Sequence, residues 1–349
     1  MPKNERTVKI GGVTIGGDHP VAIQSMLCCA LEDVEGNIAQ GKALEQAGCE
    51  IVRVTVPNAQ GVKLLSALKE TLTIPVVADI HYDYKMALEA VAAGADKIRL
   101  NPGNLSSPDQ VRQVAQACRN AGIPIRVGAN SGSVAADILA RHGGQPTAAA
   151  LAESALAQVH MLEQFDFNDL VVSIKASHVP TMVEACRIFA AQSDIPQHIG
   201  VTEAGTPRMG LVKSAIGIGS LLLDGIGSTL RVSLTADPVE EIRAAKDILL
   251  ACGLRRDRVE VVSCPTCGRC KVDVLTLAEK VEQMVENIRK PLTVAVMGCV
   301  VNGVGEGKQA DIGIAGGDGE YLLFKKGVAI QKYPMEGILE VLKAEIESM

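Results

Sequence analysis

Three cysteines stand at intervals of three residues in the segment VVSCPTCGRC. A tight turn can bring the sulfurs of Cys264 and Cys267 to one side, so that both thiolates bind one metal centre. A structural zinc site normally adds a second cysteine pair or two histidines. The other cysteines of this region are Cys270 and Cys299, and no histidine follows His198. Zinc held by the four cysteines stays open, but the pattern favours an iron–sulfur cluster, whose usual ligands are thiolates.

Inert buried thiols are a third and weaker interpretation of this segment. Gly and Pro lie between the cysteines, which indicates a loop and not a core strand. The remaining cysteines are scattered, and we interpret most of them as small apolar side chains of the core. They are Cys28, Cys29, Cys49, Cys118, Cys186 and Cys252.

A second group of chemically capable residues stands at the ends of β-branched runs. Five of its members are cationic, although the chain carries a net charge of −6. Cations that converge on one place in an acidic protein predict a multiply charged anion as ligand, most simply a diphosphate. The candidates are Arg53, Asp79, His81, Arg99, Asn101, Arg126, Asn130, Lys175, Glu203, Arg231 and Ser233.

The alternative is that these charges are solvated rim residues in weak surface ion pairs. For the set as a whole we favour ligand binding, because Arg53, Arg99, Arg126 and Arg231 lie inside apolar runs, where an unpaired guanidinium is costly. A single residue such as His81 could be purely structural. Glu203 could be a counter-ion of Lys175, or a carboxylate that moves a proton or holds a hydroxyl.

The elements that would position these residues repeat one theme, a short β-branched run followed by an Ala/Leu/Glu-rich segment of helical period. Eight such units predict a TIM (β/α)₈ barrel, whose active site lies at the carboxyl ends of the strands. The predicted strands are residues 21–26, 51–56, 75–80, 97–103, 124–132, 170–177, 198–205 and 229–234. Asp237 and Pro238 then begin a helix as N-cap and first helical residue.

The pattern changes past about residue 255. A linker runs into the strand VEVVS, and a helix (LTLAEKVEQMVENIRK) and a strand (LTVAVMG) follow before Cys299. We expect NGVGEG, which carries Glu306, to be a loop, ADIGIAGG and EYLLFKKG to form a hairpin, and the last residues to form an amphipathic helix. This predicts a small α/β domain.

Composition excludes several classes of function. Aromatic residues make up 2% of the chain, which argues against single-stranded nucleic acid binding by stacking, and the net charge offers no basic surface for phosphate backbones. The first residues, MPKNERTVKIGG, have no signal-peptide character, and no apolar run reaches the ~18 residues of a membrane span. We expect a cytoplasmic protein with reduced thiols.

Several motifs together resemble the IspG/GcpE family of hydroxymethylbutenyl diphosphate synthases, in its bacterial two-domain form. They are CPTC at 264–267, GCVVNG at 298–303 with GE at 305–306, VTEAG at 201–205, KSAIGIG at 213–219, STLRVSL at 228–234, DPVEEI at 237–242, RLNPGN at 99–104 and ADIHYDY at 78–84. The resemblance covers nearly the whole chain.

This resemblance implies an oxidoreductase of the non-mevalonate (MEP) isoprenoid pathway. Such an enzyme reduces 2-C-methyl-D-erythritol 2,4-cyclodiphosphate with two electrons to (E)-4-hydroxy-3-methylbut-2-enyl diphosphate and water, and takes its electrons from flavodoxin or ferredoxin. The resemblance also implies one [4Fe–4S] cluster per chain and a homodimer in which each cluster domain caps the partner's barrel. A linker as short as about 255–259 favours this capping in trans.

The residues carried over from the family divide between the two domains. We expect a substrate-binding barrel over residues 1–255 and a cluster-binding α/β domain over residues 256–349. The implied metal ligands are Cys264, Cys267, Cys299 and Glu306, and the implied substrate ligands are Arg53, His81, Arg99, Arg126, Asn130, Lys175, Glu203, Arg231 and Ser233. Glu203 and Glu306 are the candidate catalytic residues, Glu203 for proton handling.

Three departures from the family pattern affect details. QSMLCCA replaces the family's QSMTNT, so the contacts of that loop are open, and we attribute Cys28 and Cys29 to chance. Val304 replaces a proline in the turn that presents Glu306, and we expect the turn to persist. Cys270 stands where the family often has no cysteine, and it could compete with Glu306 as fourth ligand, although we favour Glu306.

Two other classes of protein remain as alternatives. One is a phosphate-binding TIM-barrel enzyme of non-redox chemistry with a structural zinc domain, which would be colourless. The other is an electron carrier or scaffold whose barrel binds no small diphosphate. The reductase alone predicts a brown, iron-containing protein with affinity for a cyclic diphosphate.

Overall fold

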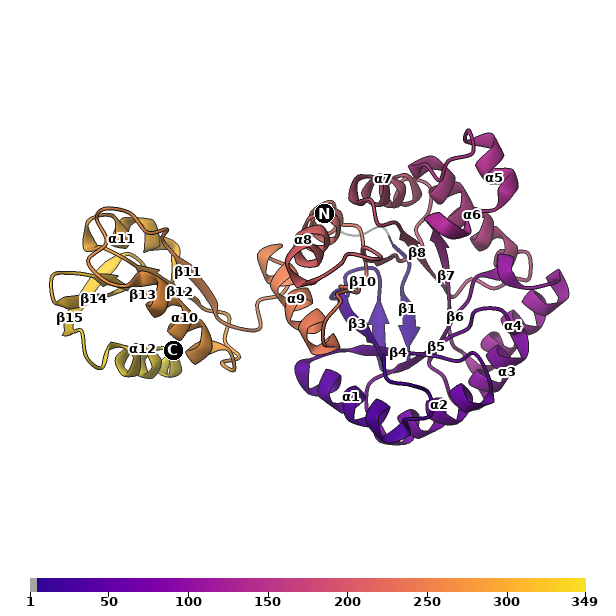
Figure 1. Ribbon diagram of the computed structural model, residues 1–349, viewed down its shortest axis with the longest axis horizontal. Helices are drawn as coiled ribbons and strands as arrows, with labels where there is room; N and C mark the ends of the chain where they lie inside the picture. Colours follow the sequence, from indigo (N-terminus) through magenta and orange to yellow (C-terminus); the bar gives the residue numbers. More distant parts are fainter. Residues whose placement is uncertain (1–4) are drawn as a thin grey trace. The chain divides into compact units, whose positions relative to one another are not determined.

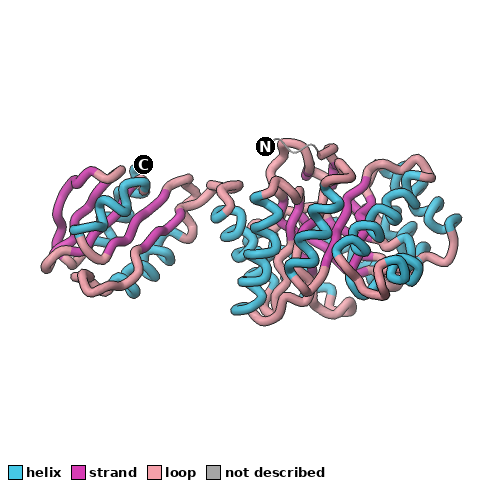
Figure 2. The backbone as a smooth tube through the Cα atoms, turned by 90° about the horizontal axis from the view of Figure 1, so that it is seen from above, coloured by secondary structure: helices cyan, strands magenta, loops and turns pink. Residues whose placement is uncertain are grey.

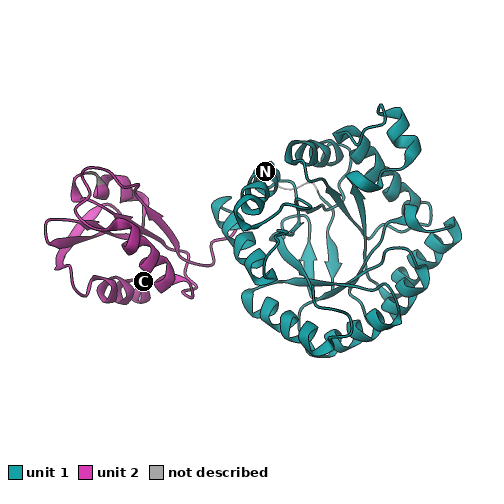
Figure 3. Cartoon of the chain, viewed as in Figure 1, with its two compact units in different colours: residues 1–254 teal, residues 255–349 magenta. Residues whose placement is uncertain are grey.

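The computed structural model describes residues 5–349, apart from the side chain of Asn302. The chain forms two compact units, Met1–Leu254 and Arg255–Met349, which Figure 3 shows in different colours. Each unit has an apolar core of its own.

The first unit is a barrel of eight parallel strands, which confirms the predicted fold (Figure 1). Each predicted run contains one strand, and the ring closes at a parallel bridge between Val172 and Gln197. The strands are β3 (Ala22–Met26), β4 (Ile51–Thr55), β5 (Val76–Asp79), β6 (Lys97–Arg99), β7 (Ile125–Asn130), β8 (Leu170–Lys175), β9 (His198–Ile199) and β10 (Thr229–Leu230).

Helices surround these strands, as the cyan and magenta tubes of Figure 2 show. Most begin at a side chain that caps their free N–H groups: Asp33 accepts from Gly36 N at 2.9 Å, and Asp237 accepts from Val239 N at 2.9 Å. The helices are α1 (Val34–Ala47), α2 (Ala59–Thr71), α3 (Tyr84–Ala92), α4 (Pro108–Ala121), α5 (Ala136–Arg141), α6 (Ala148–Glu163), α7 (Val179–Ala190), α8 (Pro207–Leu223) and α9 (Pro238–Ala251).

A hairpin of β1 (Val8–Ile10) and β2 (Val13–Ile15) covers the amino ends of the barrel strands. Its buried Ile10 and Ile15 join an apolar cluster with residues near the strand starts, such as Ile51 and Val77. We did not predict this hairpin, although two glycines between alternating apolar residues are a hairpin signal. Because the hairpin covers the amino ends of the strands, their carboxyl ends form the accessible end of the barrel.

The second unit is a mixed sheet with helices on both faces. Its strands β11 (Glu260–Ser263), β12 (Thr293–Met297) and β13 (Ile312–Gly316) are parallel, and β14 (Glu320–Lys325) and β15 (Val328–Pro334) continue antiparallel. The predicted hairpin is therefore confirmed as β13 and β14, while β15 was missed. Helices α10 (Val274–Val285) and α12 (Ile338–Ser348) share one apolar cluster with the sheet.

The prediction that NGVGEG is a loop was wrong. Residues Val300–Glu306 form helix α11, which is followed by a 3₁₀ turn at Gly307–Gln309. The glycines permit close packing: a Cβ on Gly303 would lie 2.7 Å from Met297 Cβ, and one on Gly307 would lie 2.7 Å from Phe324. Glu306 is thus presented by a helix, on which Val304 packs against the sheet.

Candidate functional site

The barrel mouth gathers the predicted arginines around two carboxylates. Asp79 of β5 lies 3.0 Å from Arg99 Nη1 on one side and 3.6 Å from Arg53 Nε on the other. The three residues come from the neighbouring strands β4, β5 and β6, whose alternate side chains share one face. These side chains are almost buried, so the ion pairs are shielded from water and fix the two guanidinium groups.

Glu241 is the second carboxylate, and sequence reasoning missed it. It belongs to α9, and its oxygens lie 3.3 and 3.4 Å from Arg231 while also accepting from Ser25 Oγ at 3.1 Å and from Leu234 N at 3.0 Å. In the sequence it stands only as an acidic residue in the first turn of that helix, which favours the helix N-terminus. A glutamate that is 3% exposed serves instead to hold Arg231.

Several guanidinium groups have N–H donors that are weakly bonded or have no acceptor among the described residues. Arg53 Nε and Nη2 lie 3.1 and 2.7 Å from the sulfur of Met26, which is a weak acceptor. Arg126 is 1% exposed and donates to Ser173 Oγ at 2.7 Å, but its Nε and Nη2 have no partner in the described part of the chain. Buried donors without acceptors are rare and costly, so they indicate a ligand.

The electrostatics of the mouth also favour an anionic ligand. Burial, together with the nearby charges of Arg53 and Arg99, lowers the pKa of Arg126 well below its ordinary value. Burial, together with the charges of Arg126 and Arg53, likewise lowers the pKa of Lys175 well below its ordinary value. Burial, only partly offset by Asp79, lowers the pKa of Arg53 to about 10. Burial would raise the pKa of Asp79, but Arg53 and Arg99 hold it below its usual value.

A deeper layer of polar residues lies inside the barrel and was also missed. Lys97 is fully buried, with Nζ 3.5 Å from Gln24 Oε1, and burial and Arg126 lower its pKa well below the ordinary value. His198 is fully buried as well: Nδ1 lies 2.8 Å from Thr229 Oγ1, and Nε2 has no partner among the described residues. Lys97 could have been predicted from the sequence, because it is a charged residue at the start of an apolar strand.

The other predicted substrate ligands lie at the carboxyl ends of their strands but outside this ion-paired group. His81 is half-buried after β5. Burial raises the pKa of Asp79, and His81 adds to the larger effect of Arg53 and Arg99 in lowering it. Asn130 ends β7, and Ser233 follows β10. Glu203 is exposed with φ of +51°, in the left-handed region that side chains other than glycine seldom adopt.

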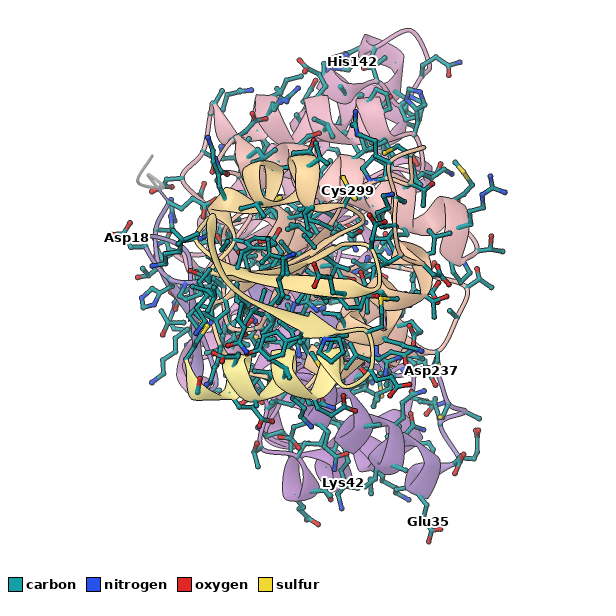
Figure 4. All side chains as sticks on the ribbon, turned by 90° about the vertical axis from the view of Figure 1, so that its left-hand side faces the viewer. Asp18, Glu35, Lys42, His142, Asp237 and Cys299 are labelled. Atoms are coloured by element: carbon teal, nitrogen blue, oxygen red, sulfur yellow. The ribbon has the colours of Figure 1, made fainter. Side chains whose placement is uncertain are left out.

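The second unit contains a cavity of about 110 Å³ that brings the proposed metal ligands together. The four cysteines of this unit and Glu306 line it, together with Pro265, Arg269 and Gly303. Cys264 follows β11, and Cys299, labelled in Figure 4, is the N-cap of α11. The cavity thus lies where the loops after two neighbouring parallel strands meet the end of a short helix.

Backbone N–H groups support the sulfurs in this cavity. Gly298 N lies 3.1 Å from Cys264 Sγ, and the backbone N–H of Arg269 lowers the pKa of the exposed Cys267 thiol. Within residues 5–349, leaving aside the side chain of Asn302, no three His, Cys, Asp or Glu side chains are arranged to share one metal ion. The four cysteines and Glu306 line the cavity, and in the described part of the chain they do not form a site for a single ion.

Comparison with known proteins identifies the family. The model described as the GcpE TIM-barrel domain matches residues 5–246, and that of the GcpE protein C-terminal domain matches residues 260–348. The chain belongs to the GcpE family. Two relatives of this GcpE protein carry the name 4-hydroxy-3-methylbut-2-en-1-yl diphosphate synthase (flavodoxin). That of Caldanaerobacter subterraneus is 50% identical over 100% of this chain and 98% of its own, and that of Ruminiclostridium cellulolyticum is 51% identical over 99% and 97%.

Solved structures add evidence on the fold of the GcpE barrel alone. Type I 3-dehydroquinate dehydratase from Clostridium difficile superposes with a TM-score of 0.52 at 14% identity, covering 71% of this chain and 98% of its own. In the part of the chain that the structure describes, no helix has the length and apolar character to cross a membrane.

Proposed function

We propose that this protein reduces 2-C-methyl-D-erythritol 2,4-cyclodiphosphate to (E)-4-hydroxy-3-methylbut-2-enyl diphosphate and water, in the non-mevalonate route to isoprenoids. The reaction consumes two electrons and two protons, opens the cyclic diphosphate and removes one hydroxyl as water. The observation that carries the proposal is the full-length match to relatives of that name, in a chain that retains both a cationic barrel mouth and a thiol-lined cavity.

We propose that the mouth binds the diphosphate. Asp79 and Glu241 pair with Arg53, Arg99 and Arg231, which leaves the charges of Arg126 and Lys175 without an ion-pair partner among the described residues. A multiply charged anion would relieve this surplus of positive charge. The unpartnered donors of Arg126 would hydrogen-bond to its oxygens. Contacts on the diphosphate, away from the reacting carbon, would position the ring. The proposed ligands are Arg53, His81, Arg99, Arg126, Asn130, Lys175, Glu203, Arg231 and Ser233.

We propose that the cavity of the second unit holds one [4Fe–4S] cluster per chain, with Cys264, Cys267, Cys299 and Glu306 as ligands. Thiolates are the usual ligands of such clusters, and four of them line this cavity together with Glu306. When bound, such a cluster supplies the electrons and, at the iron held by a carboxylate, an exchangeable position. Flavodoxin or ferredoxin is the proposed electron donor.

Glu203 is the proposed proton donor to the departing hydroxyl. Its carboxylate is exposed at the carboxyl end of β9, and its left-handed backbone conformation costs energy that functional sites often store. Glu203→Gln should turn the cyclic diphosphate over about 10²–10⁴-fold more slowly. Wild-type turnover by this variant would remove Glu203 from the mechanism.

A homodimer is proposed from an apolar stripe on α8. Met209, Val212, Ile216 and Leu223 recur at helical spacing, and each is at least 46% exposed. Exposed apolar surface of this kind commonly marks an interaction site. Ile216→Lys should shift the sedimentation coefficient from dimer to monomer, whereas a monomeric wild-type protein would contradict the proposal.

Anaerobic metal analysis with a visible spectrum tests the proposed function against a zinc-containing barrel enzyme. We expect a brown protein with iron and acid-labile sulfide after reconstitution. A colourless protein that retains zinc would favour the non-redox alternative.

A further inference from the structure

The cavity of the second unit contains one thiol more than the proposed ligand set uses. Cys270 lines it together with Cys264, Cys267, Cys299 and Glu306. Its backbone N–H donates to the carbonyl of Cys267 at 3.0 Å, and Cys267 N lies 3.5 Å from Cys270 Sγ. This turn places the Cys270 sulfur beside the segment that carries a proposed ligand.

Gly298 shows how near the extra sulfur lies to another proposed ligand. A Cβ built on Gly298 would lie 2.5 Å from Cys270 Sγ and 3.5 Å from Cys264 Sγ. The two sulfurs therefore lie over the same glycine, and any side chain there would displace Cys270. The wall of the cavity accommodates both thiols only because residue 298 has no side chain.

The spacing of the cysteines supports the same conclusion independently. Iron–sulfur proteins use the run C-x₂-C-x₂-C to hold one cluster by three consecutive cysteines. Cys264, Cys267 and Cys270 have this spacing, and Cys299 supplies a fourth sulfur. By spacing alone, the four cysteines are as complete a ligand set as three cysteines with Glu306.

We propose that Cys270 is a reserve ligand, able to take the position that Glu306 occupies at the fourth iron. This inference rests on the proposed function. In the exchange the Cys270 thiol gives its proton to solvent, its sulfur bonds to the iron, and the carboxylate of Glu306 leaves; no electron is transferred. Thiolate is the softer ligand, so Cys270 would retain the iron when Glu306 is displaced.

The competing explanation is that Cys270 is only a packing residue. It is half-buried and contacts the apolar cluster of the second unit together with Cys264 and Val272. A packing residue would affect the stability of this unit but not the number of irons that it retains.

The test is iron and sulfide content per chain after anaerobic reconstitution of Glu306→Ala, Cys270→Ser and the double variant. Wild type, Cys270→Ser and Glu306→Ala should each retain about four irons, whereas the double variant should fall to about three or fewer. Alkylation followed by mass spectrometry adds a second readout: Cys270 should react in the wild type and be protected in Glu306→Ala. Cys252→Ser, in the barrel, is the matched control.

The outcomes separate this inference from the proposed function. Equal iron contents in Glu306→Ala and the double variant, or loss of iron from Glu306→Ala alone, would overturn the reserve-ligand proposal and leave the function standing. A wild-type chain that binds no cluster would overturn both. Circular dichroism of each variant shows whether a variant that binds less iron is still folded.

Discussion

The two candidate sites are built in opposite ways. In the barrel, charged side chains stand on strands, are almost buried, and already have partners such as Asp79 and Glu241. In the second unit, donors lie on loops and on a seven-residue helix, and Cys267 is exposed. A site on rigid elements is organised before its ligand arrives, whereas a loop-borne thiol site depends on its metal for rigidity.

The largest expected effect comes from the site that depends on its ligand. Cys299→Ser in a Cys270→Ser background, where no spare thiol remains, should abolish iron binding and lower turnover at least about a thousandfold, about 4 kcal/mol of transition-state stabilisation. The same variant should make the second unit unfold at the temperature of the iron-free wild type, because metal binding is coupled to folding. Iron analysis and calorimetry measure both. Cys28→Ser, an exposed cysteine of the barrel, should change neither.

Arg126→Met tests whether the mouth is organised for an anion and not for stability. The variant removes buried donors that have no partner, so it should bind pyrophosphate about a hundredfold more weakly, given roughly 1.5–3 kcal/mol for each charge-assisted hydrogen bond. Its unfolding temperature should stay the same or rise. Titration calorimetry and thermal unfolding measure these quantities, with the exposed Arg112→Met as control. Unchanged affinity with lower stability would make Arg126 a structural residue.

Asp79→Asn should weaken the organisation of the mouth itself. Arg53 and Arg99 would lose their buried counter-ion, at a cost of about 3–5 kcal/mol in the free energy of unfolding. Because the pKa of Asp79 is lower in the folded than in the unfolded chain, its stabilisation is complete at neutral pH and is lost as the pH falls through the folded value. The difference from wild type should therefore be constant down to about pH 4 and shrink below it. Urea unfolding across this range would reveal a difference independent of pH if this account of Asp79 is wrong.

The smallest effect is expected for Lys97→Met, which should raise stability by about 1 kcal/mol at neutral pH by removing a buried ammonium group. The pKa of Lys97 is lower in the folded chain, so the unfolded chain binds more protons and wild-type stability rises with pH toward 10.5. The gain in the variant should shrink over the same range. Urea unfolding between pH 7 and pH 10 measures this difference in the free energy of unfolding. A variant less stable than the wild type would show that Lys97 is paired more strongly than its 3.5 Å contact with Gln24 indicates.

The sequence predicted the residues whose position follows from a strand. Arg53, Arg99 and Arg126 could be assigned to the mouth because the carboxyl ends of barrel strands meet in space. Glu241 and His198 could not, because their roles depend on partners on other elements, Arg231 and Thr229. Helix α11 was missed for a related reason: its glycines fit against Met297 and Phe324, which no local pattern reveals.

The central claim is that an iron–sulfur site in this chain reduces a cyclic diphosphate held by the arginines. Turnover under anaerobic conditions tests it most directly: iron-reconstituted protein is mixed with one equivalent of the cyclic diphosphate in the presence of excess dithionite, which supplies both electrons, and the products are resolved by phosphorus NMR. We predict hydroxymethylbutenyl diphosphate from the iron-loaded protein and none from the same protein loaded with zinc. Unchanged substrate in both samples, or equal product from the zinc-loaded protein, would contradict the account.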